Sequence, residues 1–163
     1  MKRIGLLSDT HSMWDDKFEK YFSDCDEIWH AGDIGSIELA DKLASLKPFR
    51  AVYGNIDDNS VRISYPETLR FELEGVDVLM THIGGYPGRY NPKIRELLYA
   101  NPPKLFICGH SHILKVMYDK KIGTLCMNPG AAGNHGFHHV RTLLKFTLEK
   151  SNIKDLEVIE IKR

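Results

Sequence analysis

The sequence has few cysteines, no excess of either charge and no long apolar run. Its three cysteines, Cys25, Cys108 and Cys126, form no Cys-x-x-Cys pair, and an odd count is typical of free thiols in a reducing compartment. Cys108 and Cys126 lie inside apolar runs, so we expect them in the core. The cysteines therefore predict a protein without disulfides, in a cytoplasmic location.

The charge balance limits the class of partner. Lysine and arginine number 22 among 163 residues, and aspartate and glutamate also number 22. A broad nucleic-acid-binding face needs a basic excess, so we expect no extended face of that kind. The apolar run near the N-terminus stops at Ser8 and Asp9, too early for a signal peptide or a membrane span. We expect a soluble protein without a membrane partner.

The first third of the chain alternates between predicted strands and helices. Apolar runs predict buried strands and helical spacing predicts helices, in the chain order 4–7, 14–22, 27–31, 36–46 and 49–53. Ser36 is expected to cap the second helix. This alternation is typical of a parallel sheet covered by helices. The length predicts one domain, 1–163.

The second half of the chain has a different pattern of predicted elements. Glu74-Gly75 forms a turn between two alternating segments, 69–73 and 76–80, which predicts a hairpin. Pro92 begins a predicted helix over 92–100. An apolar run at 105–108 predicts another buried strand. Further strands, mostly antiparallel, are expected at 116–118, 123–127, 140–148 and 156–161.

Side chains of metal-ligand type follow one predicted strand after another. They are Asp9, His11, Asp33, Asn55, His82, His110 and His112. Ligands of open parallel sheets bind beyond the carboxyl ends of the strands, so we expect these side chains to share one site. A triplet such as His110-Ser111-His112 is weak evidence alone, but ligand identity and count together indicate a metal site.

The number of ligands indicates two divalent ions. Seven are too many for one tetrahedral zinc and suit a pair of ions that share a carboxylate. Asp33 is the expected bridge, because it lies between Asp9/His11 and Asn55 in chain order. A nitrogen and oxygen set without thiolate favours manganese, with zinc, iron or nickel as alternatives.

The same residues resemble a known family. Asp9-Thr10-His11, Gly32-Asp33, Gly54-Asn55-Ile56-Asp57, His82 and Gly109-His110-Ser111-His112 resemble the five blocks of the calcineurin-like metallophosphoesterases. Asn128-Pro129-Gly130 resembles a turn of their small single-domain bacterial and archaeal phosphodiesterase branch. The resemblance implies an α/β fold, a four-layer α/β/β/α sandwich with mixed sheets. It also implies that His112 joins the metal of Asp9 and His11, and that His110 joins the metal of Asn55 and His82.

A dimetal site of this type predicts a phosphodiesterase. We expect in-line attack on a small phosphodiester by a hydroxide that bridges the metals, with Asp33, Asn55 and His110 as the catalytic residues. Two divalent ions, two aspartates and one hydroxide leave about one positive charge, which suits an anionic diester. The pattern is also compatible with a homodimer and does not require one.

Ile56 keeps other hypotheses open. Many catalysts of the family resemble Gly-Asn-His at the third block, with the histidine as a proposed general acid, and a side chain without a proton cannot protonate a leaving oxygen. The small phosphodiesterase branch also lacks this histidine. The alternatives are a weakly active or inactive scaffold of the same fold that binds partner proteins, as the resemblance to the retromer subunit suggests, and a structural or regulatory metal-binding protein.

Five further residues are expected to support the site. Arg89 and Tyr90, in the glycine-rich loop after His82, and His135, after the Asn-Pro-Gly turn, are expected to bind substrate. The neighbouring His138 and His139 are expected at the surface. His30 is expected either to hold a ligand carboxylate or to be a core histidine, and Asp57 is expected either to orient Asn55 or a ligand histidine or to be a turn aspartate.

Overall fold

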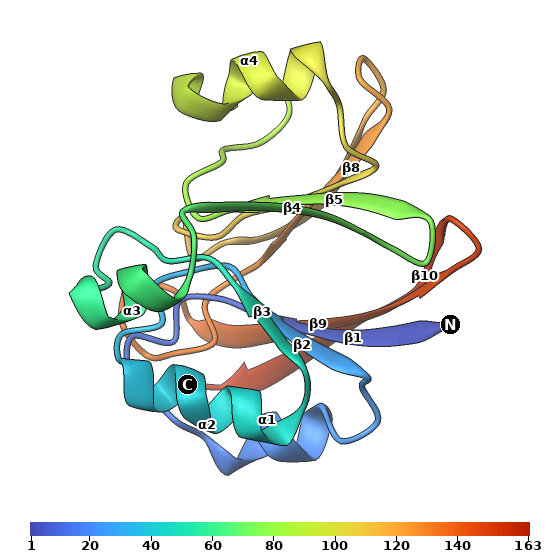
Figure 1. The fold of residues 1–163 in the computed structure, drawn as a ribbon. Coiled ribbons are helices and arrows are strands. Elements are labelled where there is room, and N and C mark those ends of the chain that lie inside the picture. The colour runs from blue at the N-terminus through green and yellow to red at the C-terminus, as the bar shows by residue number, and fades with distance from the viewer.

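Two five-stranded sheets stack face to face at the centre of the computed structural model, which describes residues 1–163 (Figure 1). The first sheet has the order β10 (Asn152–Lys162), β9 (Val140–Glu149), β1 (Lys2–Leu7), β2 (Glu27–His30) and β3 (Phe49–Ala51). The second has the order β4 (Thr68–Leu73), β5 (Val76–Thr81), β6 (Leu105–Ile107), β8 (Thr124–Pro129) and β7 (Leu114–Asp119).

Both sheets are mixed, with a parallel part and antiparallel edges. Strands β1, β2 and β3 run parallel, and so do β5, β6 and β8. The β9–β10 hairpin extends the first sheet antiparallel to β1, and β4 and β7 pair antiparallel at the edges of the second. Each parallel trio carries its carboxyl ends at one edge of its sheet, which is where the predicted ligands follow.

Helices cover the outer faces, so the molecule has four layers (Figure 1). Two helices, α1 (Asp16–Tyr21) and α2 (Ile37–Leu46), lie on the first sheet, and α4 (Pro92–Ala100) lies on the second. The short helix α3 (Asn59–Ser64) follows β3 at one end of the sheets. The expected α/β/β/α sandwich with mixed sheets is therefore confirmed.

Three apolar cores join the four layers. The core between the helices and the first sheet includes Phe18, Phe22, Ile28 and Leu43. The core between the sheets includes Ile4, Leu6, Trp29, Met80 and Phe146. The core under α4 includes Leu79, Leu98 and Phe106. Strand β1 serves two of these cores at once, which explains its unbroken apolar run.

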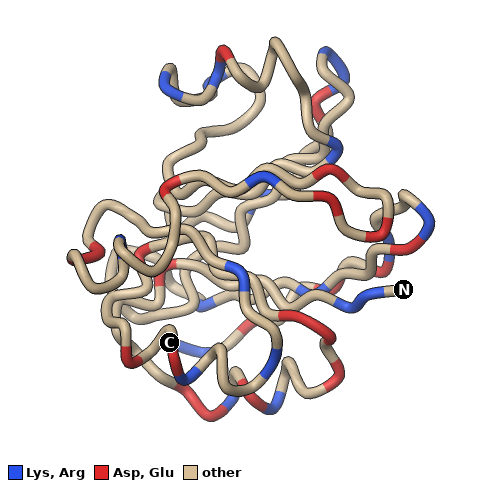
Figure 2. Tube along the Cα trace, in the orientation of Figure 1, with Lys and Arg blue, Asp and Glu red and all other residues tan.

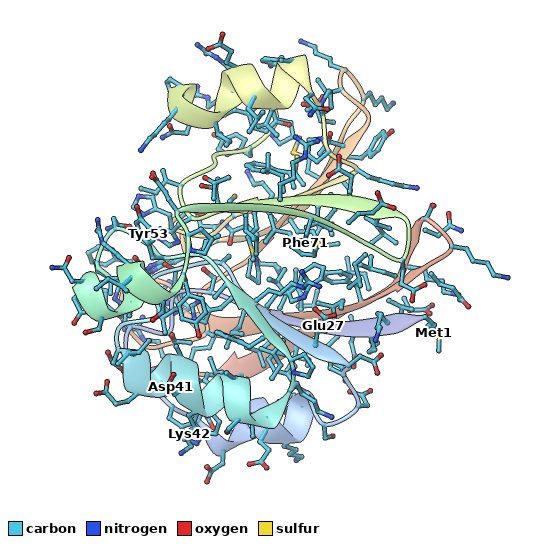
Figure 3. All side chains as sticks on the ribbon, in the orientation of Figure 1. Met1, Glu27, Asp41, Lys42, Tyr53 and Phe71 are labelled. Atoms are coloured by element: carbon cyan, nitrogen blue, oxygen red, sulfur yellow. The ribbon has the colours of Figure 1, made fainter.

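Aromatic side chains pack against one another between the sheets, and the pair Phe71–Trp29 crosses from one sheet to the other. Phe71 reaches from β4 toward β2, and its ring meets that of Trp29 edge-on with centroids 5.0 Å apart (Figure 3). Phe146 of β9 meets the same indole edge-on at 5.7 Å. Edge-to-face packing is the preferred geometry of aromatic pairs, and it fixes how the two sheets stack.

The predicted elements hold with small corrections. Helix α1 starts at Asp16 rather than at Trp14, because the Asp15 side chain caps it by accepting from the Lys17 N–H at 2.9 Å. Strand β3 ends at Ala51, and β8 pairs parallel with β6. Helix α3 was not expected from the sequence; its only buried residue is Val61.

Charged residues of both signs occur throughout the molecule (Figure 2). Acidic and basic residues are interspersed along the chain trace, as Figure 2 shows. All three cysteines are buried and free. No helix has the length and apolar character that crossing a bilayer requires.

Candidate metal centre

The seven candidate ligands lie at the carboxyl ends of strands from both sheets. Asp9 and His11 follow β1, Asp33 follows β2, Asn55 follows β3, His82 follows β5, and His110 and His112 follow β6. Since the sheets stack face to face, these ends meet. The site is therefore built from both sheets.

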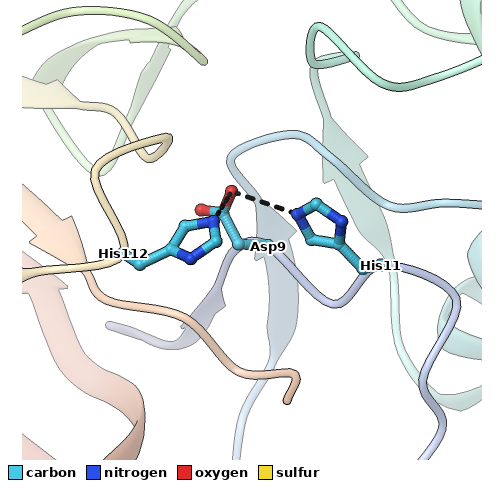
Figure 4. Close-up of side chains that lie close together, drawn as sticks. All are labelled: Asp9, His11 and His112. Carbon is cyan, nitrogen blue, oxygen red and sulfur yellow. Dashed lines mark ion pairs between the residues drawn. The ribbon is translucent and has the colours of Figure 1, made fainter. Parts of the chain in front are cut away.

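Asp9 lies at the centre of one group of ligands (Figure 4). Its Oδ1 atom is 3.2 Å from Nε2 of His112 and 3.9 Å from Nε2 of His11. Its Oδ2 atom accepts hydrogen bonds from Ser8 Oγ at 2.6 Å and from the His110 N–H at 3.1 Å. One carboxylate oxygen is thus held by the protein, and the other faces three imidazoles, because Nε2 of His82 also lies 3.7 Å from Oδ1. Ser8 was not predicted as part of the site, although it precedes Asp9 directly.

Asp33 lies between His11, which follows β1 of the first sheet, and His82, which follows β5 of the second. Its Oδ2 atom lies 3.2 Å from Nε2 of His82 and 3.5 Å from Nε2 of His11, while its Oδ1 atom accepts from the Ile56 N–H at 3.0 Å. Oδ2 is therefore placed where one carboxylate oxygen can serve two ions.

Asn55 and His110 lie together at the site. Nδ1 of His110 lies 3.1 Å from Oδ1 of Asn55, and the His110 ring meets the His82 ring edge-on with centroids 5.3 Å apart. Asp33, His82 and His110 form one cluster of converging donor atoms, and Asp9, His11 and His112 form another.

Three polar atoms in this centre are buried without any hydrogen-bond partner. They are Oδ1 of Asp9, Nε2 of His11 and Nε2 of His82. A buried polar atom left unpaired costs about 1–3 kcal/mol, so three together need an explanation. They are oxygen and nitrogen donors, which divalent transition metals accept. The residues present therefore fit divalent cations.

The tautomer of His82 agrees with this arrangement. Its Nδ1 lies 2.7 Å from the carbonyl oxygen of Ala31, which can only accept, so Nδ1 carries a proton and donates it. In the neutral ring the lone pair of Nε2 then points toward Asp9 and Asp33. Ligand histidines are commonly held in this way through their second nitrogen.

Burial and neighbouring charges set the protonation of the ligands. Burial alone would raise the pKa of Asp9, but the nearby rings of His112 and His82 hold that pKa below its ordinary value. Burial is likewise outweighed at Asp33, where His82 lowers the pKa of the carboxyl. At His112 the adjacent Asp9 raises the pKa of the ring. The aspartates are thus ionised, as metal binding requires.

The ligand loops have an unusual backbone. Positive φ occurs at five of the seven candidate ligands: Asp9 at 55°, His11 at 47°, Asp33 at 56°, His110 at 73° and His112 at 64°. This left-handed region disfavours residues other than glycine. Such strain persists only where the surroundings enforce it, and it is concentrated at functional sites.

Two glycines allow the ligand loops to approach one another closely. A Cβ at Gly54, before Asn55, would lie 2.1 Å from Oδ1 of Asp33. A Cβ at Gly109, before His110, would lie 2.1 Å from Oγ of Ser8. No side chain fits at those separations, so the glycines are a steric condition for bringing the ligands together.

Asp57 supports the ligands through the backbone. Its carboxylate accepts hydrogen bonds from the N–H groups of Ile34 at 3.2 Å, Gly35 at 2.8 Å and Gly54 at 2.7 Å. The expectation that it orients the side chain of Asn55 or a ligand histidine is wrong, because no such contact exists. It ties the loop after Asp33 to the loop before Asn55.

Of the two expectations for His30, the structure agrees with the core histidine. It is fully buried and holds no ligand carboxylate. Its Nδ1 accepts from the Gly32 N–H at 3.0 Å, so its Nε2 carries the proton and donates to Oγ1 of Thr10 at 3.0 Å. Burial lowers the pKa of His30 to about 3. It therefore ties together the backbones that carry Asp9 and Asp33.

The predicted substrate residues divide into two kinds. Tyr90 is a wrong prediction: its side chain is 4% exposed, and its hydroxyl donates to Oδ2 of Asp119 at 2.7 Å in the core under α4. Arg89 is exposed on a cavity that His110 also lines. The exposed ring of His135 stacks on that of His11, with centroids 4.5 Å apart. Arg89 and His135 thus lie beside the centre.

The last histidines of the chain differ from each other. His138 is half-buried, not a surface residue: its ring meets His112 edge-on at 5.5 Å, and Nε2 donates to the carbonyl oxygen of Gly133 at 2.7 Å. The loop that carries His138 has no regular apolar spacing, so the sequence contains no signal of this packing. His139 is exposed, as expected.

Comparison with known proteins agrees with the fold and identifies the family of the chain. A family model described as a calcineurin-like phosphoesterase superfamily domain matches residues 1–151. A probable metallophosphoesterase from Methanothermobacter thermautotrophicus is 30% identical over 135 residues, covering 78% of this chain and 76% of that protein. An archaeal phosphodiesterase structure has a TM-score of 0.75 at 20% identity, covering 98% of this chain and 99% of that one. Vps29 from Entamoeba histolytica, complexed with zinc, has a TM-score of 0.74 at 15% identity over 98% of both chains.

Proposed function

Because the chain belongs to the calcineurin-like phosphoesterase superfamily, we propose that it is a metal-dependent phosphodiesterase that hydrolyses a small phosphodiester. The observation that carries the proposal is the set of three buried atoms without partners, Oδ1 of Asp9 and Nε2 of His11 and His82. The two histidine nitrogens both face Oδ2 of Asp33, which supports a pair of divalent ions. The archaeal phosphodiesterase with the same fold supports a diester as substrate.

The ligands divide between two positions. Asp9, His11 and His112 hold one ion, Asn55, His82 and His110 hold the other, and Asp33 is shared; the clusters of donor atoms support this division. Manganese is the metal that we propose first, and zinc, iron and nickel suit the same nitrogen and oxygen donors.

Each group of the chain has a role in the reaction. When bound, two divalent ions make a hydroxide nucleophile available at neutral pH and stabilise the phosphoryl oxygens during in-line displacement. Asn55 supplies a neutral carbonyl oxygen, which preserves the positive charge that attracts the diester. His110 faces both Asn55 and a neighbouring cavity, so it lies where ions and substrate meet.

Turnover of bis(p-nitrophenyl) phosphate by the manganese-reconstituted protein tests the proposal. We expect metal-dependent hydrolysis that falls by about 100-fold or more in Asp33→Ala and His110→Ala, because each change removes a proposed ligand. Asp41→Ala and His139→Ala change the same residue types at exposed positions and serve as controls. Equal rates in all five proteins would contradict the enzyme, and saturation below two equivalents of metal would contradict the dimetal centre.

A second candidate function is a scaffold that binds a partner protein over this edge. An exposed isoleucine follows a candidate ligand in three places: Ile56 is 45% exposed, Ile83 is 39% exposed and Ile113 is 62% exposed. Apolar side chains at the rim of a site suit a protein partner as well as a substrate. Metal-loaded protein that binds two equivalents but hydrolyses no phosphodiester would favour this function.

A further inference from the structure

A cavity of about 230 Å³ opens beside the candidate metal centre. His110 lines it on one side, and buried residues, among them Cys108, Cys126 and Met127, form its floor. Complete small-molecule sites usually enclose about 300–1,000 Å³. The cavity is therefore large enough for one organic group of a phosphodiester but too small for a whole dinucleotide.

Two basic side chains stand on this cavity without an acidic partner. Arg89 and Lys115 make no ion pair, and no aspartate or glutamate is among the 15 residues that line the cavity. Lys115 Nζ lies 3.7 Å from the centre of the Tyr86 ring, so an aromatic face positions this cation. In a chain with equal numbers of acidic and basic residues, an acid-free cavity with two free cations is a local excess of positive charge.

A second cleft on the other side of the centre offers a contrast. It has a volume of about 540 Å³ and also contains two basic residues, Arg62 and Lys93. Lys93 Nζ pairs with Oε1 of Glu67 at 2.6 Å. Arg62 donates to the carbonyl oxygens of Asp57 at 2.7 Å and Asn55 at 3.3 Å. Both cations there are already engaged, so only the smaller cavity has cations free for a ligand.

We propose that the smaller cavity binds an organic group of the substrate and selects one that carries a second anionic group, such as a terminal phosphate. The inference rests on the proposed phosphodiesterase function, since it places the reacting phosphate at the metal centre. The apolar floor contacts the organic group, and Arg89 and Lys115 bind the second anion at the rim. Asn91, whose Oδ1 already accepts from the Lys93 N–H, offers its amide N–H groups as further donors on the same cavity.

A matched pair of dinucleotides tests this preference. The probes are adenylyl-(3′→5′)-adenosine with and without a 5′-terminal phosphate, so they differ by one anionic group. We expect kcat/KM of the manganese-loaded protein to be about tenfold higher for the phosphorylated probe, the size expected of a charge-assisted hydrogen bond. Arg89→Gln and Lys115→Gln should each bring this ratio toward one.

The control lies at the other end of the same hairpin. Lys121→Gln removes the same charge as Lys115→Gln from the exposed β7–β8 turn, outside the cavity, and should keep the tenfold ratio. A ratio near one in the wild type, or an equal loss in Lys121→Gln, would overturn the inference, whereas hydrolysis of both probes would leave the proposed function intact.

Binding separates the two proposals if neither probe is hydrolysed. Titration calorimetry of both probes against the metal-loaded wild type and Arg89→Gln measures the preference without turnover. Tighter binding of the phosphorylated probe that is lost in Arg89→Gln supports the anion site even if the protein is no enzyme. Equal binding of both probes by both proteins rejects it.

Discussion

The candidate ligands hold their positions against local backbone preference. The left-handed conformation that five of them adopt costs roughly 1–2 kcal/mol at a residue with a Cβ. Hydrogen bonds to the ligand loops offset this cost. The Asp57 carboxylate accepts from three backbone N–H groups next to Asp33 and Asn55. The site is therefore preformed by the loops, and metal binding does not have to create it.

His30 makes a prediction about acid stability. Its pKa of about 3 in the folded protein lies below the ordinary value of 6.5, so the unfolded chain takes up the proton first. The stabilising contribution of neutral His30 is complete above about pH 6.5 and is lost as the pH falls toward 3. We expect it to add a slope of about 1.4 kcal/mol per pH unit to the unfolding free energy of the metal-free protein between about pH 6 and 4.

Denaturant unfolding of wild type and His30→Asn over that pH range measures this slope. Asparagine can still accept from the Gly32 N–H but does not titrate. The slope of the unfolding free energy against pH should therefore decrease by about 1.4 kcal/mol per pH unit in the variant, which corresponds to one proton. His139→Asn, at an exposed position, is the control and should keep the wild-type slope. Parallel curves for wild type and His30→Asn would refute the prediction.

Ile56 makes a prediction about leaving groups. It is 45% exposed next to Asn55, and its N–H donates to Asp33, so a side chain at this position lies beside the centre. Ile56→His should raise turnover of alkyl phosphodiesters by about 100-fold, because a general acid protonates a poor leaving oxygen, and should change p-nitrophenyl esters little. Ile113→His introduces the same group after His112 and should show no such difference between substrates. Equal effects on both substrate types would argue against an acid at position 56.

The limits of sequence reasoning are visible at single residues. The seven ligand candidates could be recognised because each follows an apolar strand, and strand ends converge. Tyr90 could not be placed, because its partner Asp119 is 29 positions away and only the fold of the second sheet brings them together. For His30 the sequence left a ligand-holding and a core role open, and only the structure shows that its hydrogen bonds go to Thr10 and Gly32 rather than to a carboxylate.

Helix α3 shows why some elements escape a reading of the sequence. Helix α2 has ten residues, a Ser36 cap and a regular apolar face, and its predicted bounds agree with the structure. Helix α3 has six residues and one buried side chain, so no periodicity marks it. Its start is fixed by Asp58, which accepts from the Val61 N–H at 3.3 Å. Aspartates in ordinary turns make the same kind of bond, so Asp58 alone does not indicate a helix.

The same helix makes a prediction about the Asn55 loop. Arg62 reaches back from α3 to the carbonyl oxygens of Asp57 and Asn55. Arg62→Met should weaken metal binding by about tenfold, because the loop that presents Asn55 loses its tie. Titration calorimetry with manganese measures the change, and Arg95→Met, at an exposed position on α4, is the matched control. Unchanged affinity in Arg62→Met would show that the loop is held without this arginine.

At the scale of the whole molecule, the proposed ions would add metal–ligand bonds to the apolar packing and hydrogen bonds that already join the two sheets. Metal at 100 times its dissociation constant should stabilise the folded state by about 2.7 kcal/mol for each independent site. For a chain of this size 1 kcal/mol corresponds to about 2–4 °C. Chelation should therefore lower the melting temperature by about 5–10 °C or more, measured by calorimetry, while Asp33→Ala should respond less. A melting temperature of the wild-type protein that does not change with chelator would contradict a metal centre.

The layered architecture was predictable only in part. The strand and helix alternation of the first third indicated a parallel sheet, and the hairpin at Glu74-Gly75 marked the start of a second pattern. The stacking of two sheets came from the family resemblance. Which strand pairs with which, such as β9 beside β1, depends on contacts between residues about 140 positions apart. Apolar periodicity carries no information on such pairing.

Each proposed ion would draw ligands from both sheets, so the stacking of the sheets has a chemical consequence. Trp29 and Phe71 meet across the gap between the sheets, and Phe146 packs on the same indole, so we expect the size of these rings to influence how far apart the ligands of the two sheets lie. Relatives that keep all seven ligands but carry smaller aromatic groups at these positions should prefer ions of smaller radius. Metal preference in such proteins would then evolve through residues that never touch the metal.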